Sequence, residues 1–125
     1  MWEILFWVYL VNAVLLINHE IDSAYWQEWE LFHLPGGITG FLLLHFPLVF
    51  LILYGLVLVY QQTTGGLVVS LLLSLGGLFA FSIHIFFIRR GRDEFKSPMS
   101  RSILVGTLVV SVVQAGITLY LMVQT

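Results

Sequence analysis

The chain has 125 residues, of which 59% are apolar and 10% are charged, and its mean hydropathy is +0.98. Soluble domains carry roughly 25% charged residues, so this composition excludes an ordinary soluble domain. A net charge of −2 leaves no surface that could neutralise several phosphates, which excludes nucleic-acid binding. The absence of cysteine excludes disulfides, cysteine-based zinc sites, iron–sulfur clusters and thiol chemistry.

The charged residues divide the chain into membrane-length apolar segments. The five basic and seven acidic residues all lie at position 3, in the window 20–30 or in the window 89–101. A membrane-spanning helix needs about 20 apolar residues, and residues 2–18, 38–60, 67–88 and 103–123 supply four such spans. The first helix is expected to continue through residues 19–31, because no helix breaker precedes Pro35. The sequence predicts an all-α integral membrane protein, one domain over residues 1–125 forming a four-helix transmembrane bundle with both termini on the same side.

The basic residues predict the orientation of this bundle. All five lie between the third and fourth spans, so the positive-inside rule places that loop in the cytoplasm. The loops that contain Trp29 and Arg92 are then both cytoplasmic, and both termini lie outside the cell membrane. The first span lacks a basic leading segment and a small-residue cleavage site, so we expect a retained helix rather than a signal peptide.

Three of the four histidines are expected at the same depth in the bundle. His19 ends the first span, His45 lies roughly 10 Å below the start of the second, and His84 lies roughly 7 Å before the end of the third. The first and third spans run toward the cytoplasmic face and the second runs away from it. The three imidazoles should therefore share one layer, and ionisable groups at membrane depth usually face the bundle interior.

Three imidazoles and a carboxylate form a ligand set that suits zinc, iron or a similar divalent metal. The predicted ligands are His19, His45 and His84, with Asp22 as a fourth ligand or as the carboxylate that orients a histidine. Asp22 shares a helix face with His19 at i+3. Asp22 and the more distant Glu30 are the candidates for acid–base catalysis. Position 23 is serine, so the His-Glu-x-x-His helix of zinc peptidases is excluded.

The remaining polar residues have structural interpretations. His33 is expected to lie at the membrane interface and bond a carbonyl, and Glu20 to be solvated or paired with an arginine. Glu28 and Glu30 could simply solvate the membrane surface. The last span carries a polar face expected to join helices by hydrogen bonds, with a cavity wall as the alternative. The residues of this face are Thr107, Ser111, Gln114 and Thr118.

Three short runs resemble an uncharacterised family of small bacterial four-helix integral membrane proteins. The runs are Asn18-His19-Glu20-Ile21-Asp22, Glu28-Trp29 and Leu44-His45-Phe46-Pro47-Leu48. The resemblance covers about residues 15–55 and supplies no activity. The first run is also similar to membrane proteins named for a His-x-x-Glu-Glu motif, but position 23 lacks the second acid. The acidic, tryptophan-bearing first loop is similar to that of emopamil-binding and sigma-2 type sterol isomerases and receptors, whose acids bind a cationic ligand or shuttle a proton.

These observations leave four functions open. The first is a metal-dependent enzyme, such as a hydrolase, that acts on a lipid or a hydrophobic small molecule entering from the bilayer. The second is a b-type haem protein with iron between His45 and His84. The third is a metal-free ligand binder or isomerase that uses Asp22 and Glu30. The fourth is a non-catalytic accessory protein, and a homo-oligomer is compatible with all four.

Overall fold

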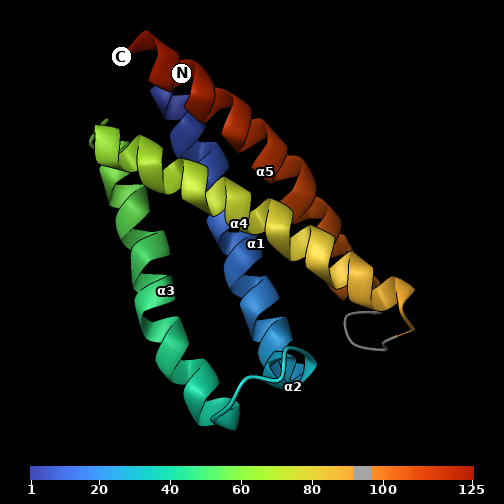
Figure 1. The fold of residues 1–125 in the computed structure, drawn as a ribbon. Helices are drawn as coiled ribbons and strands as arrows, with labels where there is room; N and C mark the ends of the chain where they lie inside the picture. Colours follow the sequence, from blue (N-terminus) through green and yellow to red (C-terminus); the bar gives the residue numbers. More distant parts are fainter. Residues whose placement is uncertain (92–96) are drawn as a thin grey trace.

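The computed structural model describes residues 1–91 and 97–125, which form helices and no strand (Figure 1). The helices are α1 (Trp2–Tyr25), α2 (Glu28–Leu31), α3 (Gly37–Tyr60), α4 (Thr64–Arg89) and α5 (Pro98–Gln124). All but α2 are long and apolar enough to cross a membrane, which confirms the predicted all-α, four-helix membrane fold. Part of the predicted basic loop, residues 92–96, lies outside the described residues.

The third and fourth long helices begin earlier than their apolar segments. Thr63 precedes α4, and its hydroxyl accepts a hydrogen bond of 2.9 Å from the Gly66 amide. Ser97 does the same for α5, accepting a hydrogen bond of 3.1 Å from the Ser100 amide, and Pro98 occupies the first helical position. Side-chain caps of this kind satisfy the unpaired amides of a first turn, so polar residues before the apolar segments become helical.

The first helix does not continue to residue 31 as the sequence suggested. α1 ends at Tyr25, and Gln27 adopts a left-handed conformation with a φ of 54° that turns the chain into α2. Such a conformation costs an L-residue about 1–2 kcal/mol. Burial offsets this cost, because Leu31 packs with Leu104 and with aromatic side chains that include Trp26. The long-range contact overrides a local sequence that has no helix breaker.

A buried polar network joins α1, α4 and α5. The amide nitrogen of Asn12 donates to Gln114 Oε1 at 2.8 Å and to Ser111 Oγ at 3.1 Å. The amide nitrogen of Gln114 donates to the carbonyl of Ser70 at 3.0 Å. Gly77 permits this close packing, since a Cβ there would overlap Ser111 Oγ. The polar face of the last span therefore joins helices, as expected of small and amide side chains in membranes.

α3 is held against α1 and α4 near the α3–α4 turn. The Tyr9 hydroxyl donates to the carbonyl of Ile52 at 2.6 Å, and Gly55 leaves room for Tyr9 and Val69. From this turn α3 and α4 diverge, and α2 lies at the opposite end of the bundle from the two termini (Figure 1).

Candidate functional site

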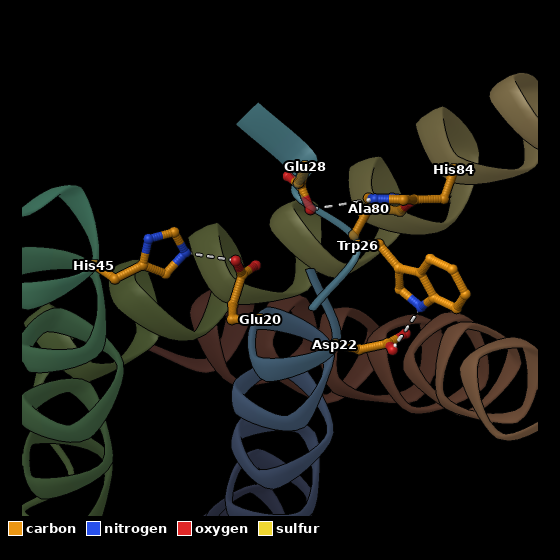
Figure 2. A network of polar contacts seen from close by, with 7 residues as sticks. All are labelled: Glu20, Asp22, Trp26, Glu28, His45, Ala80 and His84. Carbon is orange, nitrogen blue, oxygen red and sulfur yellow. Dashed lines mark hydrogen bonds and ion pairs between the residues drawn. The ribbon is translucent and has the colours of Figure 1, made fainter. Parts of the chain in front are cut away.

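His19 on α1 and His84 on α4 meet inside the bundle. Each side chain is 2% exposed, and their rings lie edge to face with centroids 4.6 Å apart. The Nδ1 of His84 lies 2.7 Å from the carbonyl oxygen of Ala80, so the Nδ1–H donates to this carbonyl (Figure 2). Nε2 therefore carries the lone pair of a neutral His84. The predicted convergence of these two histidines is present.

Glu28, at the start of α2, brings a carboxylate to the same place. Its Oε2 lies 3.4 Å from the Nε2 of His84 (Figure 2). Burial raises the pKa of the Glu28 carboxyl, but the neighbouring His84 imidazole and Ser23 hydroxyl lower it more, so the pKa falls below its usual value. Glu28 is therefore an anion that faces a ring nitrogen.

His19, Glu28 and His84 bring three metal-donor atoms close together. One donor atom from each lies within 4.8 Å of the other two, and among the described residues these form the group of three donors that could hold a metal ion. Ligand bonds of about 2.0–2.2 Å at tetrahedral angles place two donors about 3.3 Å apart. The separation of 3.4 Å between His84 and Glu28 agrees with this value.

His45 lies outside this set and pairs with Glu20. Its Nε2 is 2.5 Å from Glu20 Oε2, its Nδ1–H donates to the carbonyl of Phe41 at 2.6 Å, and its ring stacks on the Phe41 ring. Since Nδ1 carries one hydrogen, a single further proton lies between His45 and Glu20. Glu20, expected in water or beside an arginine, is instead half-buried against this histidine.

The two acids predicted for catalysis point elsewhere. Asp22 Oδ1 accepts a hydrogen bond of 2.9 Å from the indole Nε1 of Trp26. Figure 2 shows Asp22 turned toward Trp26, whereas Glu20 points toward His45. The side chain of Glu30 is exposed on α2. Asp22 thus connects the end of α1 to the turn before α2.

A cavity of about 210 Å³ adjoins the three donors. Its polar lining consists of His19, Glu20, Glu28 and His84, and the rest of the lining is apolar and lies mostly on α3 and α4. Leu51 on α3 and Phe79 on α4 line it and are 44% and 65% exposed, so the cavity opens sideways between these helices. In a membrane this opening would face lipid.

Glu28 is the residue of this group that the sequence analysis did not place in the site. On an uninterrupted helix, residues 19 and 28 differ by nine positions, which puts them on opposite faces at 100° per residue. The same arithmetic places Glu30 beneath His19. The turn at Gln27 brings Glu28 to the side of His19 and leaves Glu30 exposed. Nothing in the sequence around Glu28 predicted this turn.

The comparisons with known proteins give a family but no activity. No curated protein and no solved structure matches the chain. Residues 5–121 match the family described as a family of unknown function, DUF6713. The match covers nearly the whole chain and includes every residue of the donor set. The chain therefore belongs to the DUF6713 family.

Proposed function

We propose that the chain is an integral membrane metalloprotein in which His19, Glu28 and His84 hold one divalent ion, zinc or iron. The observation that carries the proposal is the convergence of three donor atoms within 4.8 Å. The side chains of His19 and His84 are almost fully buried. Burying an ionisable group at membrane depth costs free energy, so such groups usually have a binding partner or a functional role.

The contact between His84 and Glu28 favours a cation at this position. A neutral His84 presents a lone pair at Nε2, because its Nδ1–H is donated to Ala80, and a carboxylate oxygen faces that lone pair. Two acceptors face each other stably only with a proton or a metal ion between them. The distance of 3.4 Å is the spacing of two ligands of one metal ion, whereas a proton shared between the two atoms would favour a distance of about 2.7–2.9 Å.

The bond from His84 to Ala80 is also typical of a metal ligand. Histidine ligands usually donate their second ring N–H to a carbonyl or a carboxylate, which fixes the ring and the tautomer. Three protein ligands leave one coordination position for water or substrate, as in catalytic zinc sites. Because the donors line a cavity, we place this open position on the cavity side.

An ion bound there would supply a Lewis acid that polarises an oxygen atom or acidifies a water molecule. The residues of the chain would orient and enclose the reacting molecule. The apolar walls would exclude water, and Glu20 brings a second carboxyl group to the polar end, next to the proton that it shares with His45. We therefore propose a metal-dependent enzyme that acts on a lipid or a hydrophobic small molecule.

Metal analysis of the protein, purified without a polyhistidine tag, tests the metal site. We expect about one zinc or iron atom per chain in the wild type and less than a tenth of that in His84→Ala. His33→Ala is the matched control, because His33 is exposed and should leave the metal content unchanged. Substitution of a residue that only hydrogen-bonds to a metal ligand typically lowers metal affinity by about 10- to 100-fold. Loss of a ligand itself should lower it by more.

An absorption spectrum of the same sample separates the haem alternative. A Soret band would point to iron porphyrin rather than to a single ion. A wild type without metal, or a His84→Ala variant that retains it, would contradict the proposed site.

A further inference from the structure

The cavity next to the donor set has two chemically different ends. His19, Glu20, Glu28 and His84 form its polar end. From His84 the lining continues along one face of α4 to Val69, which is about 22 Å at 1.5 Å per residue. Apart from His84, the lining residues on this face are apolar or glycine. A ligand that fills this space must be an amphiphile with its polar group at the donor set.

The extent of the cavity lining favours a single chain over a fused ring system. The cavity has a volume of about 210 Å³, and its lining residues on α4 are spread over about four turns. Gly76 lies midway along this face, and a Cβ added there would meet nothing within 4 Å. Gly76 is exposed and lines the cavity, so the absence of a side chain there leaves an open passage for an alkyl chain at the mouth of the cavity.

The charge at the polar end favours an anionic head group. A divalent ion with two neutral imidazoles and the Glu28 carboxylate carries a net charge of +1. A carboxylate matches the single positive charge, and its oxygen atoms are ligands for zinc and iron.

We propose that the cavity binds a long-chain fatty acid, with the carboxylate at the donor set and the alkyl chain between α3 and α4. The head-group preference rests on the proposed metal site, whereas the position of the chain rests on the cavity alone. Entry is sideways from the bilayer, because Leu51 and Phe79 line the cavity and are exposed at its opening.

The test uses palmitic acid with a photoreactive diazirine in mid-chain, added to the full chain in phosphatidylcholine nanodiscs. Labelling is quantified by intact mass and mapped by peptide. We expect saturable labelling of α3 and α4 that unlabelled palmitate suppresses and cholesterol does not. Gly76→Leu should reduce it by about tenfold or more, since its side chain fills the passage. Gly116→Leu is the matched control, because Gly116 also has open space around it and lies outside the cavity lining.

Metal content is measured on the same samples and separates this inference from the proposed function. Both glycine variants should retain the wild-type metal. Labelling of Gly76→Leu at the wild-type level, or displacement by cholesterol instead of palmitate, would overturn the fatty-acid site even if metal is present. A metal-free wild type whose labelling still depends on Gly76 would overturn the metal site and leave the chain site intact.

A second cavity variant keeps the test decisive if Gly76→Leu does not fold by circular dichroism. Leu72 lines the cavity and is 54% exposed, so Leu72→Trp can narrow the passage from its outer side. It should also reduce labelling. Wild-type labelling in this folded variant would overturn the inference.

Discussion

His84 and His45 make the same contact with their own helices but face different partners. In both residues the Nδ1–H donates to the carbonyl four residues earlier, so Nε2 projects into the bundle. The Nε2 of His84 is 3.4 Å from a carboxylate, which is the spacing of two metal ligands. The Nε2 of His45 is 2.5 Å from its carboxylate, which leaves room for a proton only. Two residues of the same type thus form different interactions.

The substitution His45→Ala tests this distinction. It would leave the half-buried Glu20 carboxyl group without its partner, which should lower the free energy of unfolding by about 1–3 kcal/mol. Metal content should remain at one ion per chain. Both quantities can be measured in detergent, with thermal unfolding followed by circular dichroism. Loss of the metal without loss of stability would show instead that His45 is a ligand.

At the scale of elements, α2 determines which acid reaches the histidines. The chain turns at Gln27, directly before the four residues of α2, and Leu31 packs against Leu104 to hold α2 in place. The sequence placed His19 and His84 at one depth because helix length and direction fix depth. It did not place Glu28, because the direction of a short helix after a turn depends on tertiary contacts. His45 contacts Glu20 instead of the other two histidines, because its side chain leaves α3 in a different direction.

Asp22 is expected to act on the site through α2. Asp22→Asn retains a side-chain oxygen that can accept the bond from Trp26, so metal affinity should stay close to the wild type. Asp22→Leu removes the acceptor and should weaken metal binding by about 10- to 100-fold, as is typical of residues that position a ligand. Competition with a coloured chelator measures both affinities. Equal losses in the two variants would mean that the charge of Asp22 is itself required.

At the scale of the molecule, three uncharged segments of the sequence predicted the four spans. Residues 4–19, 31–88 and 102–125 contain no charged side chain, and a polar turn divides the longest segment into two helices. The helix ends were less predictable because the caps at Thr63 and Ser97 extend α4 and α5 into polar sequence. The cavity was not predictable at all, since it depends on how far α3 and α4 diverge.

The orientation in the membrane stays a prediction from the basic residues and can be tested with single cysteines. The chain has no cysteine, so Thr64→Cys and Met99→Cys give clean labelling positions. Both residues are exposed and lie at the starts of α4 and α5. In intact cells an impermeant maleimide should label Thr64→Cys, and Met99→Cys should react only after permeabilisation. Labelling of both from the same side would contradict the predicted arrangement of spans.

The central claim is that one metal ion lies between His19, Glu28 and His84, and X-ray absorption at the metal edge tests it most directly. The wild-type spectrum should show multiple scattering from two imidazoles, with metal–nitrogen distances of about 2.0–2.1 Å, and a shell of oxygen ligands. His84→Ala, loaded with excess metal, should retain at most one imidazole. A wild-type spectrum without imidazole scattering, or an unchanged spectrum in His84→Ala, would contradict the account.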